Sequence, residues 1–184
     1  MNHPLESRIP EKTSSKTVCE VKGRKIQVDQ LRLPTGEEFE YITFVSNDFA
    51  VMVLAQTEAG KFVINEEYRH PVGEILYSLP GGCVDAGEVP QHAAGRELFE
   101  ETGYSASEYI YLGEVHPMPG NNGQKTYYYL AKGAKKTGEP TPELCEIIQT
   151  KEQTLEEINE RLLGSKNIDG HLSSALCFKM LRGL

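Results

Sequence analysis

Four glutamates and an arginine lie close together in residues 82–104, which read GCVDAGEVPQHAAGRELFEETGY. Three of these glutamates, Glu97, Glu100 and Glu101, are spaced so that an α-helix would bring their carboxylates to one face. Like charges at this spacing destabilise a helix, and negative charge near its C-terminus opposes the helix dipole. A divalent cation would reverse both effects, since Mg²⁺ prefers carboxylate oxygens and keeps water molecules that a phosphate can replace. The alternative is a solvated acidic face, which is what most glutamate-rich helices have.

The ends of the expected helix carry residues with restricted or unusual backbone preferences. Pro90 suits the first turn, because its φ is already helical and its missing N–H would have no partner there. Gly103 suits the position just past the helix end, where a left-handed residue is favoured. Ala94 and Leu98 are four residues apart and would pack inward together. The sequence therefore predicts a helix of about three turns between Pro90 and Gly103.

The spacing of the whole stretch favours a metal site over a solvated face. Gly82 is followed by five residues, Glu88, seven residues, and then Arg-Glu-Leu-Phe-Glu-Glu-Thr-Gly-Tyr. This pattern matches the Nudix box at every defined position, so the chain resembles a Nudix hydrolase. The resemblance implies an α/β (α+β) fold, namely the Nudix α/β/α sandwich with a mixed sheet.

The resemblance also implies a Mg²⁺ site, in which Mn²⁺ could substitute, and assigns its ligands. Glu97 and Glu101 would be the main ligands, joined by Glu100 and by the backbone carbonyl of Gly81. Glu88 would fix the loop or hold an outer ion. The catalytic set would include Glu100 and also Arg96, which would orient the carboxylates through charge-assisted hydrogen bonds. Related enzymes place a water-activating glutamate before the last strand; the candidates are Glu143 and, second, Glu146.

Residues outside the box are similar to the subgroup that hydrolyses ADP-ribose and nucleotide sugars. Arg69, which follows a tyrosine shortly before a Leu-Pro-Gly-Gly entry to the box, would bind substrate phosphate through its guanidinium fork. Pro119 and Gly120 lie where this subgroup carries a substrate-selecting proline. Phe39 or Tyr41 would stack on the base. The chain departs from the subgroup in having Ser78 where a glutamate is common. It also has Met118 where the subgroup has a serine before Pro-Gly, and Gly123 and Gln124 where an acidic residue is expected.

The implied reaction is hydrolysis of the pyrophosphate bond of ADP-ribose or of a nucleoside diphosphate sugar such as GDP-mannose. The products would be a nucleoside monophosphate and a sugar phosphate. One alternative is a different substrate, such as NADH, a dinucleoside polyphosphate or an RNA 5′ end, which the contexts of Arg69 and Pro119 disfavour. A second is a ligand sensor without turnover. Such modules typically lose a box glutamate, and all four are present here.

Composition limits the partners of this 184-residue chain. A net charge of −8 argues against long nucleic acid as the main ligand. No apolar run is long enough for a membrane span, and no secretory signal is recognisable at the N-terminus. The four cysteines show no CxxC or zinc-type spacing. These features predict a cytoplasmic protein with reduced thiols that acts on a small phosphorylated molecule.

The remaining sequence predicts two regions, residues 1–45 and residues 46–184. In the first, a polar tail (residues 1–15) precedes strands over residues 17–21, 25–28 and 39–45, with a turn at residues 22–24. In the subgroup, such a sheet serves dimerisation or covers the substrate, so the resemblance implies a homodimer; a sheet packed on its own subunit is the alternative. In the second region, the expected strands cover residues 49–55, 61–67, 109–115, 125–132 and 147–150. At least one of three consecutive tyrosines, residues 127–129, must face the core. Residues 133–142 read as an exposed loop, and helices are expected over residues 154–163 and within residues 168–184.

Overall fold

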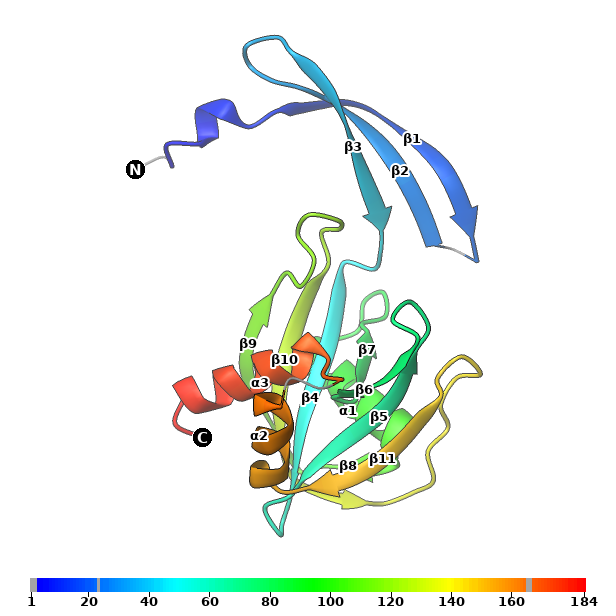
Figure 1. Cartoon of the computed structure of the whole chain (residues 1–184), viewed down its shortest axis with the longest axis vertical. Helices are drawn as coiled ribbons and strands as arrows, with labels where there is room; N and C mark the ends of the chain where they lie inside the picture. The colour runs from blue at the N-terminus through cyan, green and yellow to red at the C-terminus, as the bar shows by residue number, and fades with distance from the viewer. Residues whose placement is uncertain (1–2, 23, 165–166) are drawn as a thin grey trace. The chain divides into compact units, whose positions relative to one another are not determined.

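The computed structural model describes residues 3–22, 24–164 and 167–184, which divide into two compact units (Figure 1). The first unit comprises residues up to Asp48 together with residues 118–124. The second unit comprises residues 49–117 and the chain from Lys125 to its end. Residues 118–124, which the sequence assigned to the core region, therefore group with the N-terminal strands.

The first unit is a three-stranded antiparallel sheet in the order β1-β2-β3, as predicted. Its elements are the 3₁₀-helix η1 (Glu6–Arg8) and the strands β1 (Glu11–Val21), β2 (Arg24–Arg32) and β3 (Glu38–Val45). The expected tail is wrong for residues 11–15, which belong to β1. This strand is exposed along its whole length. Strand β1 is held by backbone pairing with β2 and buries neither face. Its sequence therefore lacks the alternation of polar and apolar residues by which a strand can be recognised. Residues 1–2 of that tail and residue 23 of the expected turn lie outside the described residues.

The second unit contains one mixed sheet with the central strand order β11-β5-β4-β10-β8. Strands β6, β7 and β9 pair with β5, β4 and β10, respectively, and only β10 and β4 run parallel among the paired strands described. The strands are β4 (Phe49–Thr57), β5 (Phe62–Arg69), β6 (Glu74–Ser78), β7 (Gly81–Cys83), β8 (Tyr104–Ser105), β9 (Glu108–Val115), β10 (Lys125–Lys136) and β11 (Ile148–Gln153).

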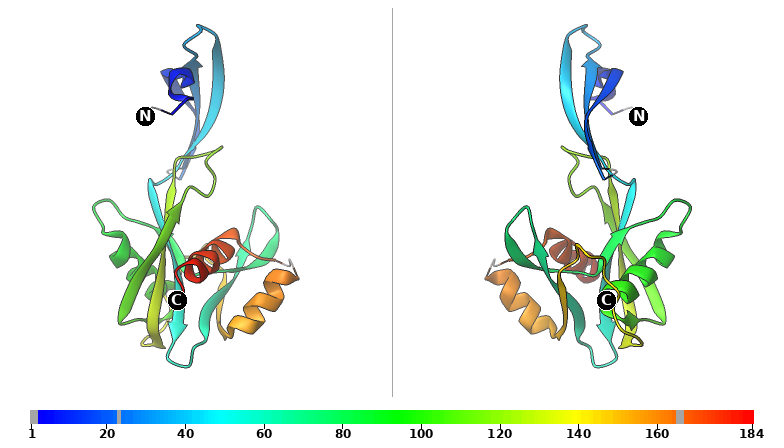
Figure 2. Two further views of the ribbon diagram at one scale, coloured as in Figure 1. Left: turned by 90° about the vertical axis from the view of Figure 1, so that its left-hand side faces the viewer. Right: turned by 90° about the vertical axis from the view of Figure 1, so that its right-hand side faces the viewer.

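Helices cover both faces of this sheet, as Figure 2 shows. Helix α1 (Pro90–Thr102) packs on one face, while α2 (Leu155–Leu163) and α3 (Gly170–Leu181) lie on the other. Alternate residues of a strand point to opposite faces, and β4 therefore contributes to both cores. Val51 and Val53 pack with α1, whereas Leu54 packs with α2 and α3. The predicted α/β/α sandwich is confirmed.

Strand β10 shows the same alternation and extends further than expected. Tyr128 is fully buried on the α3 side, which confirms that one of the three tyrosines faces the core. The expected loop over residues 133–142 is wrong in its first part, because β10 continues to Lys136. A register shift between Lys132 and Ala134 and pairing of residues 135–136 with β8 prolong the strand. The register shift at Gly133 therefore does not end the strand.

The ends of the helices follow the local sequence signals. Gly103 ends α1 with φ 73° and donates its N–H to the Phe99 carbonyl. A Cβ on Gly103 would lie 2.3 Å from the carbonyl oxygen of Gly138, so both φ and space require glycine there. Thr154 caps α2 in a capping box with Glu157, as predicted. In the part of the chain that the structure describes, no helix has the length and apolar character to cross a membrane.

Candidate active site

Helix α1 carries two of its glutamates inward. Ala94 and Leu98 are fully buried and fix the helix against the sheet. Glu97 and Glu101, on the same side of the helix, are only 9% and 6% exposed. Glu100 is half-exposed, with 44% of its side chain accessible. The crowded face predicted from the spacing is therefore split into two buried carboxylates and one at the rim.

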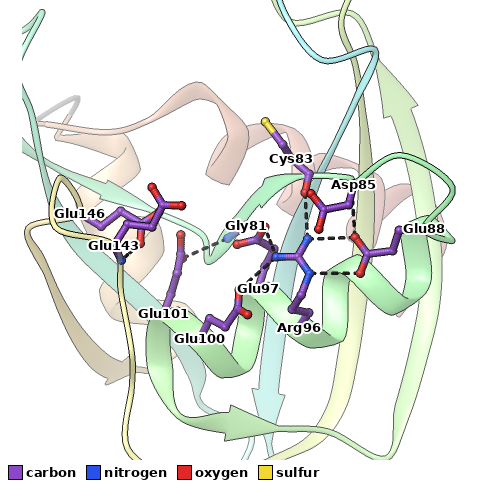
Figure 3. A network of polar contacts seen from close by, with 10 residues as sticks. All are labelled: Gly81, Cys83, Asp85, Glu88, Arg96, Glu97, Glu100, Glu101, Glu143 and Glu146. Atoms are coloured by element: carbon purple, nitrogen blue, oxygen red, sulfur yellow. Dashed lines mark hydrogen bonds and ion pairs between the residues drawn. The ribbon is translucent and has the colours of Figure 1, made fainter. Parts of the chain in front are cut away.

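Arg96 lies at the centre of a carboxylate cluster (Figure 3). Its Nε and Nη2 donate to the two oxygens of Glu88 at 3.1 and 2.9 Å. Its Nη1 donates to Glu97 Oε1 at 2.8 Å and to Glu100 Oε2 at 3.0 Å. Nη2 also reaches the carbonyl of Cys83 at 3.0 Å. One guanidinium thus orients three of the four box glutamates, and its bonds to Glu88 raise the arginine's pKa and lower that of Glu88.

Glu101 lies outside this cluster and has different partners. Its Oε2 accepts a hydrogen bond from Asn65 Nδ2 at 2.8 Å and one from the backbone N–H of Gly81 at 3.1 Å. Burial raises the pKa of Glu101 to about 9, despite the hydrogen bond from Gly81. The charges of Glu146, Glu97 and Glu67 contribute to this increase. Ionised Glu101 would therefore be unstable here without a nearby positive charge.

The pKa of Glu97 is also raised, mainly by burial, although Arg96 opposes the shift. Charge from Glu100 and Glu146 adds to the increase. Glu97 and Glu101 are therefore two adjacent carboxylates whose ionisation the protein disfavours. Burial with neighbouring negative charge is the pattern expected where a cation is to be bound.

Two glycines let the backbone approach these carboxylates. A Cβ on Gly82 would lie 2.7 Å from Glu97 Oε1, and one on Gly81 would lie 2.2 Å from the carbonyl oxygen of Val51. Both distances are far below normal contact. Gly82 thus lets β7 lie against Glu97 of α1, and Gly81 lets β7 lie against the paired strand β4, which explains two adjacent glycines at the entry to the box.

Arg69, at the end of β5, forms an ion pair. Its Nη1 lies 2.7 Å from Oε1 of Glu67, a carboxylate only 6% exposed, while the Arg69 side chain is 38% exposed. The pKa of Glu67 is raised, because burial outweighs the lowering by Arg69 and the charges of Glu146 and Asp169 add to the increase. Ser78 is also buried, and its Oγ makes no hydrogen bond with the described residues. The Arg69 guanidinium is thus held by Glu67 through Nη1, while part of the side chain is exposed to solvent.

Glu143 and Glu146 lie in the segment before β11, on the side of Glu101 away from Arg96 (Figure 3). The Glu146 carboxylate accepts a hydrogen bond from the backbone N–H of Glu143 at 2.7 Å. Its charge raises the pKa of three buried acids, which are Glu67, Glu97 and Glu101. The electrostatics therefore link Glu146, the second of the two candidates, most directly to the buried carboxylates.

The other predicted substrate residues belong to the first unit. Phe39 and Tyr41 lie on β3, 39% and 42% exposed. Pro119 and Gly120 are in the segment of residues 118–124, and Tyr41 Oη donates to the carbonyl of Gly120 at 2.8 Å. A second bond, from the Phe44 N–H to the Asn121 carbonyl at 2.9 Å, continues this attachment. The structure brings these four residues into one unit.

Comparison with known proteins assigns the chain to a family. The NUDIX domain family model matches residues 46–173. The chain belongs to the Nudix family. It is 34% identical to the methanol dehydrogenase activator of Bacillus methanolicus over 150 residues, covering 78% of this chain and 80% of that protein. It is 27% identical to the ADP-ribose pyrophosphatase of Bacillus subtilis (strain 168) over 158 residues, covering 85% of each.

The Nudix fold is also found by structural comparison. A crystal structure of an ADP compounds hydrolase superposes with a TM-score of 0.83 over 96% of both chains, at 22% identity. Family membership and the pyrophosphatase relatives indicate an enzyme, a Nudix pyrophosphohydrolase. Within the described residues, no three acidic, histidine or cysteine side chains already converge as metal ligands. The donor chemistry nevertheless fits a hard divalent cation, because two buried carboxylates are destabilised by their own charge.

Sequence reasoning missed two buried residues of this Nudix site, Asn65 and Glu67. Both lie on β5, on the face that packs against α1, where Val63 is part of the core. The signal was present in residues 61–67, KFVINEE, where polar residues continue an alternation begun by apolar ones. A polar residue on the buried face of a central strand requires a partner, and here the partners belong to the site.

Proposed function

We propose that this protein hydrolyses the pyrophosphate bond of ADP-ribose or of a nucleoside diphosphate sugar such as GDP-mannose, with Mg²⁺ as the cofactor and Mn²⁺ as a substitute. The products are a nucleoside monophosphate and a sugar phosphate. The observation that carries the proposal is the pair of buried carboxylates, Glu97 and Glu101, whose ionisation is disfavoured without a cation. The ADP-ribose pyrophosphatase among the relatives supports the choice of substrate.

The metal would be held by Glu97 and Glu101, with Glu100 and the carbonyl of Gly81 completing the set. When bound, Mg²⁺ neutralises pyrophosphate charge, lowers the pKa of water and stabilises the leaving oxygen. Arg96 holds Glu97 and Glu100 in place, and Glu88 anchors Arg96 through two hydrogen bonds. Ligand positions fixed in this way reduce the reorganisation that binding requires.

In the reaction, a water oxygen forms a bond to phosphorus while the anhydride P–O bond breaks. The proton of the water passes to a carboxylate, and the leaving phosphate departs with the electron pair of the broken bond. We assign the acceptor to the Glu143–Glu146 pair and favour Glu146, because its charge acts on Glu97 and Glu101. A general base of this kind contributes about 10²–10⁴-fold.

Arg69 is proposed to bind a substrate phosphate. Its ion pair with Glu67 uses one Nη and restricts the rotamers of a long side chain, while the exposed part of the guanidinium can take a second, bidentate partner. Phe39 or Tyr41 is proposed to stack on the base, with Pro119 and Gly120 selecting the substrate. The hydrogen bond between Tyr41 and Gly120 supports a shared role for this group.

A homodimer is proposed from the first unit. The sheet of the first unit has only three strands, and it exposes several large apolar side chains to solvent. Those exposed by 39% or more are Val18, Val21, Phe39, Tyr41, Ile42, Phe44 and Val45. A second copy of the chain would cover this surface. Light scattering coupled to size-exclusion chromatography tests this, and a monomer at micromolar concentration would contradict it.

The function is tested with a hydrolysis panel in Mg²⁺, with and without EDTA. The panel compares ADP-ribose, GDP-mannose, UDP-glucose, NADH, a diadenosine polyphosphate and a nucleoside triphosphate, with products identified by mass. We expect fast, EDTA-sensitive cleavage of ADP-ribose or a nucleotide sugar to monophosphate and sugar phosphate. Preference for the polyphosphate or triphosphate would overturn the substrate assignment and leave the metal site. Tight binding of one ligand without turnover of any would favour a sensor.

A further inference from the structure

A fully buried amide connects the sheet to the helix that carries the glutamates. Asn65, on β5, is 0% exposed. Its Nδ2 donates to Glu101 Oε2 at 2.8 Å, and its Oδ1 accepts from Thr150 Oγ1 at 3.0 Å. A buried amide without partners would cost free energy, so both hydrogen bonds are needed at this position. The three side chains form a chain of hydrogen bonds that runs from Thr150 through Asn65 to Glu101.

The register of the sheet explains why these side chains meet. Strands β11 and β5 are antiparallel, and Thr150 is directly opposite Asn65. Directly opposed residues project from the same face of a sheet. That face packs against α1, because Val63, two residues before Asn65 on β5, belongs to the core shared with α1. The backbone therefore delivers Thr150 and Asn65 to Glu101 without any contribution from a loop.

The chemistry of the three groups fixes the direction of each hydrogen bond. Ionised Glu101 can only accept, so it must meet the NH₂ end of the Asn65 amide. The carbonyl end then faces Thr150, whose hydroxyl can donate. Glu101 thereby selects the orientation of the amide, and the Thr150 hydroxyl, which can donate or accept, donates to Asn65 Oδ1 and holds the amide in that orientation. Both donors to Glu101, the Asn65 amide and the Gly81 N–H, bind Oε2, which leaves Oε1 for another ligand.

We propose that Asn65, held by Thr150, is the positioning residue for Glu101 as a metal ligand. This inference rests on the proposed function. A neutral donor favours the carboxylate form without bringing a positive charge that would compete with a cation. It also fixes the rotation of the carboxylate, which a single bond from Gly81 leaves free. The expected effect is that of an outer-shell partner, which changes metal affinity by about 10–100-fold.

The test measures Mn²⁺ binding to the free protein by electron paramagnetic resonance, alongside thermal unfolding and turnover. Asn65→Ala removes the amide without adding charge, Asn65→Leu replaces it with an apolar side chain of similar size, and Thr150→Val removes only the hydroxyl that holds the amide. Tyr128→Phe is the matched control, because it deletes another buried hydrogen bond in the same unit, to His171 Nδ1 at 2.6 Å on the α3 side. This residue has no place in the proposed site.

We expect both Asn65 variants to bind Mn²⁺ about 10–100-fold more weakly, Thr150→Val to weaken binding less, and Tyr128→Phe to bind as the wild type does. Turnover should need correspondingly more Mg²⁺, with little change in the KM for ADP-ribose. Wild-type Mn²⁺ affinity in the Asn65 variants would overturn the proposal. Equal weakening by Tyr128→Phe would overturn it too, since the cause would be general destabilisation. If Asn65→Leu does not fold, Asn65→Ala and Thr150→Val still decide.

The same experiment separates this proposal from the proposed function. Glu101→Gln is included as a variant that removes the ligand itself. If wild type binds Mn²⁺ and turns over substrate, Glu101→Gln does neither, and the Asn65 variants behave as wild type, only the positioning role is lost. If wild type binds no Mn²⁺ and hydrolyses nothing in the panel, the proposed function fails, and the positioning role is overturned with it.

Discussion

Asp29 in the N-terminal unit and Glu101 in the Nudix unit are both almost completely buried, and the two acids behave in opposite ways. Asp29, in the N-terminal sheet, is 7% exposed, and its pKa is lowered, chiefly by the hydrogen bond from Ser15. Thr43 and Lys12 contribute in the same direction. Glu101, in the Nudix unit, is 6% exposed, and its pKa is raised to about 9. Similar exposure thus accompanies opposite shifts.

The difference lies in the neighbours. Asp29 accepts hydrogen bonds from two hydroxyls, at 2.5 Å from Ser15 and 3.0 Å from Thr43, and a lysine Nζ lies 3.9 Å away. Glu101 also has two donors, but three more carboxylates act on it. An acid surrounded by donors and positive charge stabilises its own unit. An acid surrounded by other acids destabilises the fold when it ionises, and this agrees with the proposed cation site.

Replacing Glu101 with glutamine should have the largest effect on turnover. The change removes a ligand charge at nearly constant volume, so we expect kcat to fall by at least about 10²-fold, the scale of losing one charge-stabilising group. The fold should persist, because glutamine still accepts from Asn65 and Gly81. The measurement is steady-state hydrolysis of ADP-ribose in Mg²⁺, with thermal unfolding as the control. A variant with near-native kcat would refute the ligand assignment.

Gly82→Ala should weaken the site through geometry and leave its charges intact. The added Cβ would lie 2.7 Å from the Glu97 carboxylate, which must move because it is the end of a flexible side chain. We expect Mn²⁺ affinity to fall by about 10–100-fold, as for a displaced ligand, with a small change in stability. Gly87→Ala is a control for backbone strain, since φ is +81° there and nothing lies within 4 Å of the added Cβ. Equal Mn²⁺ affinity in wild type and Gly82→Ala would contradict the role of Glu97.

The opposite pKa shifts predict opposite pH dependences of stability. A raised folded pKa, as for Glu101, gives stability that is present below the ordinary glutamate pKa of 4.5 and is lost as the pH rises towards about 9. A lowered folded pKa, as for Asp29, gives stability that is present above 3.8 and is lost as the pH falls. In EDTA, the thermal midpoint of the Nudix unit should therefore decrease between pH 5 and pH 9.

Glu101→Gln removes one source of that slope and should flatten it. A difference of one kcal/mol corresponds to about 2–4 °C for a protein of this size, so a relative gain of that order at pH 9 is expected. Glu97 and Glu67 also have raised pKa values, and they leave part of the slope in place. Identical slopes for wild type and Glu101→Gln would show that the Glu101 carboxyl does not titrate in this window.

Much of the fold could be predicted because its signals are local. Pro90, Gly103 and the inward pair Ala94 and Leu98 defined α1, and each has the role expected from its own chemistry. Residues 11–15 could not be predicted, because β1 depends on pairing with β2 and exposes both faces. Strands that bury a face leave a pattern in the sequence, whereas strands held by backbone pairing alone do not.

The site divides in the same way. The four box glutamates and Arg96 were found because their spacing lies within one helix and its preceding loop. Asn65 and Glu67 were missed because their roles depend on which strand packs against that helix. Asn65 and Glu101, for example, form a hydrogen bond but are 36 residues apart in the sequence. The choice between Glu143 and Glu146 depended on the path of an irregular segment, which no periodicity describes.

Asp29→Asn tests the structural side of the comparison and should have the smallest effect on turnover. The variant keeps one acceptor for the hydroxyls of Ser15 and Thr43 but turns the other into a donor and removes the charge near Lys12. We expect the N-terminal sheet to lose about 1.5–3 kcal/mol, the range for hydrogen bonds to a charged group. Hydrogen exchange of the β2 amides measures this locally, without assuming that the two units unfold together.

Glu20→Gln is the matched control on the same sheet. Glu20 pairs with Lys25 at 3.6 Å, but both side chains are well exposed, so its loss should cost no more than about 0.5 kcal/mol. Faster β2 exchange in Asp29→Asn than in Glu20→Gln would mark Asp29 as a structural acid. If both variants exchange like wild type, burial with satisfied partners contributes no stability here. In that case only Glu101, whose neighbouring carboxylates disfavour its ionisation, would have a measurable effect on stability, and Asp29 would have none.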